Sequence, residues 1–462
     1  MLYERGVLFS SQAFVLAFLP IVLGLYYAAP GLRTRQAVLV AGSLVFYGCW
    51  DVRFVPALVL LTLAIWLIVR WYAASGQRWV LGLGIALNLG VLGVCKYADF
   101  VGANVAALFG AGFTPFGIIL PLGVSFFTFQ KISYLVDLRR GDRHVYGLLE
   151  FFAFVTFFPQ LIAGPIVRHN EMMPQWRRDP HGPALWQNLS RGLVLFTIGF
   201  AKKAGLADTL GPICDPLFAK AVLEPLNAAE GWLAAVSFAL QIYFDFSGYS
   251  DMAIGLGLMF GLRLPFNFDA PYRACSIREL WRRWHMTLSR FLRDYVYIPL
   301  GGNRGGGLDQ ARNVVTTMLL GGLWHGAAWT FVAWGGLQGV ALAVNGAWVR
   351  RGWGMPRALG WVLTLGFFVA AFVLFRAADF PSALRVLGGM AGLDGVGHVR
   401  VRDAWALALG AVLAVAGPSS QEIALARMPP YAWAAIPAGV ALVGLLLLSG
   451  GRVPTEFIYF QF

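Results

Sequence analysis

Long apolar stretches recur along the whole chain, and polar residues form only short connections between them. A helix needs about 20 predominantly apolar residues to cross a hydrocarbon core of roughly 30 Å. The pattern predicts membrane helices near residues 10–29, 36–50, 54–72, 79–97, 115–136, 148–167, 189–207, 231–261, 313–329, 330–348, 358–376, 404–417 and 431–449. Some candidates are short or broken, so we expect an all-α bundle of about 10–13 membrane segments, forming one domain over residues 1–462.

Two of these stretches carry helix-breaking residues in apolar surroundings. Residues 115–130 contain Pro121 and Gly123, and residues 158–168 contain prolines and a glycine. Proline removes a backbone donor and bends or ends a helix. We therefore expect both stretches to be kinked or re-entrant, which a membrane tolerates only where protein or a water-filled cavity surrounds them.

Composition excludes several classes of protein. Charged residues make up 13% of the chain and hydrophobic residues 58%, whereas a soluble domain carries about 25% charged residues. The net charge of +13 comes from short Lys and Arg clusters between apolar stretches, which indicates positive-inside topology and no binding of nucleic acid. The four cysteines are scattered without a CxxC pair, so neither a metal site nor a disulfide framework is expected.

A basic amphipathic segment interrupts the apolar pattern at residues 273–312. Its excess of arginine predicts a cytoplasmic position. Ser276 and Glu279 form an S-x-x-E capping box, so a helix is expected to start at Ile277 and to lie along the inner interface, aromatic residues inward and arginines outward. His285 is expected on this helix, either as a functional residue or as an interfacial histidine that bonds a neighbouring loop.

His325 lies at membrane depth in the predicted helix that follows. Thirteen steps separate it from Arg312, which at about 1.5 Å per residue is roughly 20 Å. An ionisable side chain there is expensive and is a functional candidate by default. The alternative is a neutral imidazole that links helices by hydrogen bonds.

Asp245 and Asp251 also interrupt an apolar stretch. Buried carboxylates need partners, which arginines or helix N-termini could supply. Their separation of six residues is out of register for one helix face, so a catalytic pair is not expected and a structural or gating role is favoured.

Several motifs together resemble the membrane-bound O-acyltransferase family, in particular its alginate O-acetyltransferase branch. They are PLGVSFFTFQKISYLVD, FFPQLIAGPIVRH, YFDFSGYSDMAIGLGLMFG, LPFNFDAPYRACSI, ELWRRWHMTLSRFLRDYVYIPLGGNRGG, LWHGAAWTFVAWG and the C-terminal FIYFQF. The resemblance covers nearly the whole chain. It implies a conical helical bundle with re-entrant segments and a tunnel between the two membrane faces.

The resemblance also implies an activity. His325 corresponds to the histidine regarded as catalytic in the family, and His285 to its other polar position. The expected donor is acetyl-CoA at the cytoplasmic face, with no permanently bound cofactor. The acetyl group would cross a bacterial inner membrane and pass to a periplasmic acetyltransferase that modifies an exported polysaccharide, alginate by branch.

The predicted site includes further residues beside the two histidines. Expected to line the donor site or tunnel are Trp281, Arg282, Trp284, Ser289, Asn303, Trp324, Trp329, Asp245 and Asp251. The basic inner surface would attract the phosphates of CoA, and neutral His325 would act as general base. Tyr459 is a hypothetical acetyl carrier at a mobile terminus, and its alternative role is that of an aromatic interface anchor.

Other functions remain open at this point. The acceptor could be cellulose, peptidoglycan or another exopolysaccharide. The membrane-depth Asp and His residues would also suit a proton-coupled transporter, and a non-catalytic scaffold of a secretion complex is a third possibility.

Overall fold

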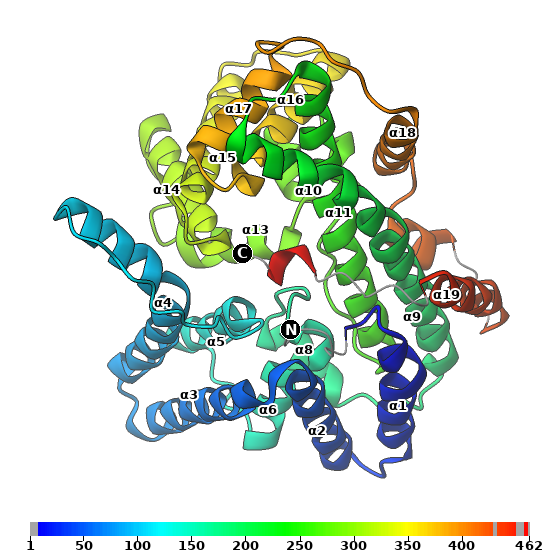
Figure 1. Ribbon diagram of the computed structural model, residues 1–462. Helices are drawn as coiled ribbons and strands as arrows, with labels where there is room; N and C mark the ends of the chain where they lie inside the picture. Colours follow the sequence, from blue (N-terminus) through cyan, green and yellow to red (C-terminus); the bar gives the residue numbers. More distant parts are fainter. Residues whose placement is uncertain (1–7, 428–431, 450–456, 461–462) are drawn as a thin grey trace. The chain divides into compact units, whose positions relative to one another are not determined.

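The computed structural model describes residues 8–427, 432–449 and 457–460, and all regular secondary structure in these residues is helical (Figure 1). This confirms the predicted all-α fold. The chain divides into two compact units that alternate along the sequence. Unit 1 comprises the described parts of residues 1–200, 249–265 and 427–454, and unit 2 those of residues 201–248, 266–426 and 455–462. The prediction of a single functional domain stays a prediction.

Unit 1 is built mainly from long apolar helices. Its elements are η1 (Phe14–Phe18), α1 (Leu19–Ala28), α2 (Leu32–Asp51), η2 (Val52–Phe54), α3 (Val55–Ser75), α4 (Arg78–Leu108), α5 (Val124–Arg139), α6 (Leu148–Thr156), α7 (Phe158–Leu161), α8 (His169–Trp176), α9 (Leu185–Phe200), η7 (Ala432–Ala435) and α19 (Ile436–Ser449). Helix α11 (Ala228–Met259) begins in unit 2 and ends in unit 1.

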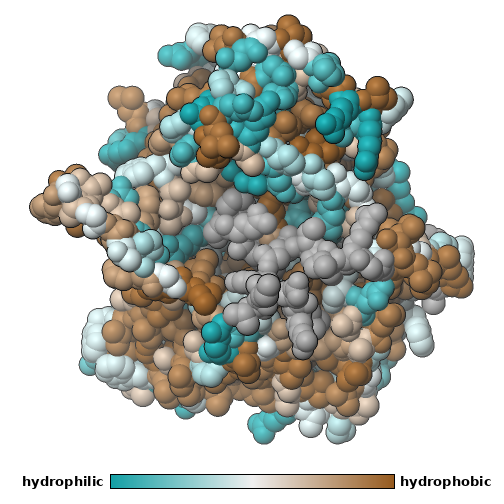
Figure 2. All heavy atoms as spheres, in the orientation of Figure 1, coloured by the Kyte–Doolittle hydropathy of each residue, from teal (hydrophilic) through white to brown (hydrophobic). Residues whose placement is uncertain are grey.

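The surface of unit 1 is largely apolar where its long helices face outward. Leu60 and Leu67 of α3 and Leu83 of α4 are exposed, and Figure 2 shows hydrophobic residues over large parts of the visible face. Among the described residues, the segments Leu32–Ser75 and Arg78–Leu108, and Arg357–Arg376 of unit 2, are long and apolar enough to cross a membrane. These surfaces suit contact with lipid tails.

The two stretches with helix-breaking residues are interrupted as expected. The helix predicted from residue 115 begins only at Val124, because Gly123 adopts a left-handed φ of +72° in close contact with the backbone of Leu161. A side chain at that position would be strained and would clash. The helix predicted over residues 148–167, which contains the other stretch, is divided between α6, the short α7 and a turn at residues 162–164.

Unit 2 carries the segments that contain both histidines. Its elements are η3 (Ala201–Ala207), α10 (Asp208–Leu223), most of α11, η4 (Pro271–Arg273), α12 (Ile277–Arg283), α13 (Met286–Leu292), η5 (Arg293–Tyr297), α14 (Gly307–His325), α15 (Trp329–Arg350), α16 (Arg357–Arg376), α17 (Phe380–Met390), α18 (Val401–Val415), η6 (Glu422–Arg427) and η8 (Ile458–Phe460).

Helices α14 and α15 form a tightly packed antiparallel pair, seen side by side in Figure 1. Glycines let the two backbones touch, since a Cβ on Gly322 would clash with the Phe331 carbonyl oxygen, and one on Gly335 with that of Met318. Small residues allow such close approach between membrane helices. The pair thereby fixes the end of α14, where His325 is the last helical residue.

We expect Gly335→Ala to lower stability by about 1–3 kcal/mol, because its methyl group would force α14 and α15 apart. Gly336→Ala is the matched control, since its methyl group would meet only the flexible end of Leu319. The thermal midpoint of each purified variant measures the difference. Equal midpoints would show that stability does not depend on this close packing of α14 and α15.

The basic amphipathic segment is broken where a continuous helix was expected. Its start at Ile277 is confirmed, and Ser276 Oγ accepts the Glu279 N–H at 3.2 Å. Its arginines Arg278, Arg282 and Arg293 are exposed, while Trp281, Trp284 and Phe291 are buried. The helix ends at Arg283, however, and α13 starts at Met286. The prediction that His285 lies within a helix is therefore wrong.

Candidate functional site

His325 lies in an aromatic enclosure within unit 2. It is 5% exposed, and its ring centroid lies 5.2 Å from that of Trp334 and 5.1 Å from that of Phe375. Trp324, the residue before it, approaches to 4.9 Å. Gly326 follows as the C-cap, where a Cβ would clash with the ring of Phe331. The end of α14 thus holds the imidazole among rings that exclude bulk water.

His285 lies between α12 and α13 in a left-handed conformation, with φ of 42° and ψ of 53°. Such a conformation costs about 1–3 kcal/mol for a residue with a side chain, and it persists only where surrounding contacts enforce it. Asn267 supplies these contacts. Its carbonyl oxygen accepts the Met286 N–H at 2.9 Å, and its side chain accepts the Thr287 hydroxyl at 2.6 Å.

These contacts also define the protonation of His285. Asn267 Oδ1 accepts hydrogen bonds from Thr287, so it is an oxygen, and it lies 3.3 Å from His285 Nδ1. Nδ1 must therefore donate, which leaves the lone pair on Nε2. No described residue bonds to Nε2, and burial lowers the pKa of His285 to about 3. The ring is neutral at physiological pH and presents a proton acceptor.

The C-terminal segment places Tyr459 beside both histidines. The Tyr459 ring lies 5.8 Å from that of His325 and 6.5 Å from that of His285, between ring centroids. Phe246 of α11 packs against Tyr459 at 4.3 Å and against His285 at 4.7 Å. Tyr459 and the two histidines therefore form one cluster within unit 2.

A buried ion pair anchors this segment. Asp245 Oδ2 accepts the backbone N–H of Ile458 at 2.8 Å, while its Oδ1 lies 2.8 Å from Lys203 Nζ. Lys203 is also bonded to Asp208 at 2.7 Å. Asp245 thus anchors the backbone at Ile458, the residue before Tyr459.

A basic pocket of about 290 Å³ opens in unit 2 beside the basic segment. Its lining combines arginines with apolar faces of α14 and α15. It includes Arg278, Trp281, Arg282, Ser289, Arg293, Asn303, Val314, Met318, Leu342 and Arg350. Four predicted donor-site residues, Trp281, Arg282, Ser289 and Asn303, therefore gather in one pocket.

The pocket connects to His325 through continuous side-chain contacts. Trp281, in the pocket lining, lies 6.0 Å from Trp334 between ring centroids, and Trp334 contacts His325. Met318 lines the pocket seven residues before His325 on α14, which is two helical turns or roughly 10 Å. The pocket and the imidazole thus occupy the same face of α14.

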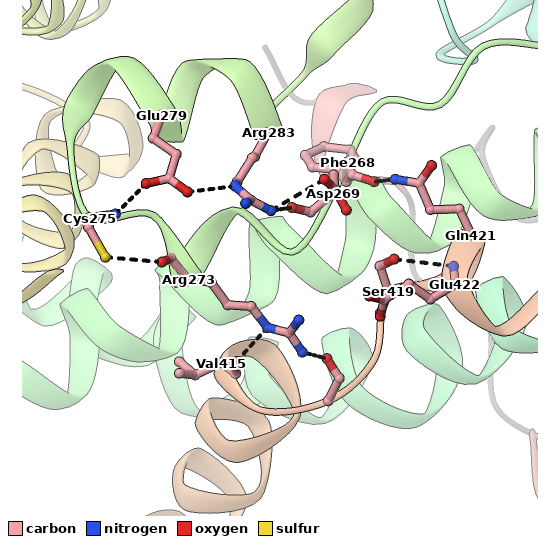
Figure 3. A network of polar contacts seen from close by, with 11 residues as sticks. Phe268, Asp269, Arg273, Cys275, Glu279, Arg283, Val415, Ser419, Gln421 and Glu422 are labelled. Carbon is pink, nitrogen blue, oxygen red and sulfur yellow. Dashed lines mark hydrogen bonds and ion pairs between the residues drawn. The ribbon is translucent and has the colours of Figure 1, made fainter. Parts of the chain in front are cut away.

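A polar network fixes the approach to α12, which carries Trp281 (Figure 3). Arg273 donates to the carbonyl oxygens of Val415 at 2.8 Å and of Gly417. Arg283 bonds Glu279 at 3.1 Å and Asp269 at 3.3 Å. The Arg283–Asp269 bond ties the preceding loop to the C-terminal end of α12, and Arg273 ties the same loop to the end of α18.

Other predicted residues are not among those that line the pocket. Trp284 is buried among Phe268, Phe368 and Phe372, with ring centroids 5.0 to 5.5 Å away. Trp329 begins α15 and is 55% exposed. Asp251 belongs to unit 1, whereas Asp245 belongs to unit 2. Trp324 contacts His325 and lies 6.3 Å from His285 between ring centroids.

Sequence reasoning missed Lys203, Phe246, Asn267 and Gln338, which support this arrangement. Lys203 did carry a signal, because a lysine within an apolar stretch calls for an anionic partner such as Asp245. The others act through contacts between segments distant in sequence. Chemically, the cluster offers imidazole groups that can take a proton from a hydroxyl, a phenol within reach, and a basic pocket for an anionic substrate.

Comparison with known proteins supports this chemistry over most of the chain. Residues 124–378 match the family described as MBOAT, membrane-bound O-acyltransferase family. The chain is 40% identical over 429 residues to Peptidoglycan O-acetyltransferase of Helicobacter pylori, covering 84% of this chain and 81% of that protein. It is 43% identical over 398 residues to Probable alginate O-acetylase AlgI of Pseudomonas aeruginosa, covering 83% and 75%.

A more distant relative carries a different transferred group in its name. Teichoic acid D-alanyltransferase of Streptococcus thermophilus is 28% identical over 358 residues, covering 73% of this chain and 81% of that protein. The named relatives therefore share acyl transfer and differ in acyl group and acceptor.

Proposed function

The chain belongs to the membrane-bound O-acyltransferase family, and on this premise we propose that it moves an acetyl group from cytoplasmic acetyl-CoA across the membrane for O-acetylation of an exported polysaccharide. Family membership makes it a membrane acyltransferase. The observation that carries the finer proposal is the basic pocket, whose lining leads along one face of α14 to buried His325.

The pocket suits the donor because of its charge and shape. Its arginines Arg278, Arg282, Arg293 and Arg350 are matched to phosphate groups. The apolar faces of α14 and α15 would receive the extended arm of the donor, with the thioester directed toward His325. The aromatic enclosure would protect the thioester from hydrolysis by excluding water.

The reaction uses the histidines as proton acceptors. His325 would take the proton of an acceptor hydroxyl as the oxygen attacks the thioester carbonyl, and the carbon–sulfur bond would then break. CoA leaves as the thiolate and takes up that proton from His325. Neutral His285 would position the hydroxyl group through its Nε2 lone pair.

Tyr459 is the candidate first acceptor, because its ring lies close to both histidines. Its phenolic oxygen would become an acetyl ester, and a second transfer would pass the acetyl group outward to the polysaccharide. We propose that a periplasmic acetyltransferase receives it and that the chain lies in the bacterial inner membrane.

Alginate is the proposed acceptor, as the names of AlgI relatives suggest. Peptidoglycan is the second candidate, because a relative of that name is 40% identical to the chain. Expression in a strain that lacks its own acetylase would separate them. Restored acetyl content of alginate supports the first candidate, and restored acetyl content of peptidoglycan alone supports the second.

The donor assignment is tested with purified protein and radiolabelled acetyl-CoA. We expect release of free CoA thiol together with transfer of label to protein or acceptor. A protein that never consumes acetyl-CoA but moves protons together with a substrate would be a transporter, and the proposal would fail. If His325→Ala leaves acetylation unchanged at normal expression, the chain would be a non-catalytic scaffold of a secretion complex.

Arg282→Gln should raise the KM for acetyl-CoA about fivefold, since it removes one cation from the rim of the pocket. The effect should shrink as ionic strength rises, because salt screens exposed charges. Arg312→Gln is the control, as Arg312 is exposed, pairs with Asp309 and lies outside the pocket lining. Steady-state kinetics at low and high salt measure both. An equal rise in KM for the control would point to general surface charge instead.

Tyr459→Phe should abolish acetyl label on the C-terminal peptide and strongly reduce polysaccharide acetylation. The substitution removes the phenolic oxygen but keeps the ring packed on Phe246. Mass spectrometry of the quenched reaction locates the acetyl group. Unchanged acetyl transfer at normal protein levels would remove the carrier role and leave Tyr459 as an aromatic anchor.

A further inference from the structure

Gln338 lies on α15 between the basic pocket and His325, and it is completely buried. Four residues before it, Trp334 contacts His325, and four residues after it, Leu342 lines the pocket. At about 1.5 Å per residue, Gln338 is about 6 Å along the helix axis from each. It therefore stands midway between the pocket and the histidine.

The amide of Gln338 has a defined orientation. Trp281 Nε1 lies 3.2 Å from Gln338 Oε1. An indole N–H can only donate, so the atom that faces it must be the amide oxygen. The amide nitrogen then points away from Trp281. No described residue accepts a hydrogen bond from it, and the same holds for the buried indole N–H of Trp334 one turn away.

Buried donors of this kind require an explanation. Nearly all buried polar groups in native proteins have hydrogen-bond partners, because an unsatisfied one is costly. Two such donors lie on one side of α15, between the basic pocket and His325. Their position indicates a ligand that brings hydrogen-bond acceptors. The pantetheine arm of CoA carries amide carbonyl groups between its phosphate end and its sulfur.

We propose that Gln338 binds an amide carbonyl of the donor's pantetheine arm between the basic pocket and His325. The inference rests on the proposed acetyl-CoA donor and deepens it. Gln338 contributes to recognition of the arm and takes no part in the bond changes at the acetyl group. The same arm could come from CoA or from a carrier protein that bears phosphopantetheine.

Affinity measurements with three probes test this role. Gln338→Leu should bind acetyl-CoA about tenfold more weakly than the wild type, while adenosine 3′,5′-bisphosphate, which lacks the arm, binds unchanged. The KM for acetyl-CoA should rise by the same factor with little change in kcat. Acetyl-phosphopantetheine, which carries the arm without the nucleotide, should lose about as much affinity as acetyl-CoA.

Gln36→Leu is the matched control, because Gln36 of unit 1 is also buried and its amide nitrogen also has no partner among the described residues. It should bind all three probes like the wild type. Gln338→Leu could fold poorly because Trp281 loses its acceptor. The double variant Trp281→Phe/Gln338→Leu removes both ends of this bond. It should show the same selective loss of affinity for the two probes that carry the arm.

The outcomes separate this inference from the proposed function. Unchanged affinity of Gln338→Leu for acetyl-CoA, or an equal loss for adenosine 3′,5′-bisphosphate, overturns the role of Gln338 alone. A wild-type protein that binds none of the probes overturns the proposed donor and this inference together. A wild type that binds acetyl-phosphopantetheine but not the bisphosphate, together with loss of that binding in Gln338→Leu, supports the role of Gln338 and assigns the arm to a carrier protein.

Discussion

His325→Ala should reduce acetyl transfer by about 10²–10⁴-fold, the contribution expected of a general base. The imidazole lies at the end of α14, within reach of the pocket face and of Tyr459. Its loss removes the group that would take the proton of the attacking hydroxyl. Release of CoA thiol by purified protein, and the acetyl content of the exported polysaccharide in cells, measure the effect.

His398→Ala is the control for this prediction, because His398 is exposed on unit 2 and distant from the cluster in sequence. It should transfer acetyl groups at the wild-type rate. His285→Ala should fall between the two, since His285 positions the hydroxyl group in the proposed mechanism. If His325→Ala keeps near-normal transfer at normal protein level, the base lies elsewhere.

Lys203→Met should destabilise the protein by about 3–5 kcal/mol, the cost of removing one partner from a buried ion pair. Asp245 would remain buried without its cation. The thermal midpoint can be followed by labelling of Cys214, whose thiol is buried on α10, after replacement of the other three cysteines. The midpoint should fall clearly below that of the parent protein.

Two double variants separate the charge from the anchor. Lys203→Met/Asp245→Asn removes both charges but keeps an oxygen that can accept the Ile458 N–H, so most of the stability and the acetyl transfer should return. Lys203→Met/Asp245→Leu also removes this acceptor, so transfer should stay low because Tyr459 loses its placement. Equal transfer by both double variants would show that the bond to Ile458 does not position Tyr459.

Much of the fold follows from apolar patterning, because long apolar helices are local features of the sequence. The start of α12 at Ile277 could also be predicted, from its capping box, whereas the helix predicted over residues 313–329 ends earlier, at His325. Trp281, Trp284 and Phe291 of the basic segment turn inward as expected, since their spacing alone defines a face.

The geometry around His285 could not be predicted from local pattern. The spacing of apolar residues stays helical from Trp281 through Leu288. The helix is nevertheless broken before Met286, where the backbone carbonyl oxygen of Asn267 accepts the Met286 N–H. The docking of Ile458 onto Asp245 joins residues 213 positions apart, and the bond from Trp281 to Gln338 joins residues 57 apart. Contacts of this range depend on how helices pack, which the spacing of residues within one helix does not define.

The most direct measurement is the structure of the purified protein with an acetyl-CoA analogue that cannot be cleaved. We expect the phosphates beside Arg282 and Arg350, the arm against Gln338, and the acetyl carbonyl about 3–3.5 Å from the attacking oxygen, which hydrogen-bonds His325. An analogue bound outside this pocket, or an arm directed away from His325, would contradict the proposed mechanism.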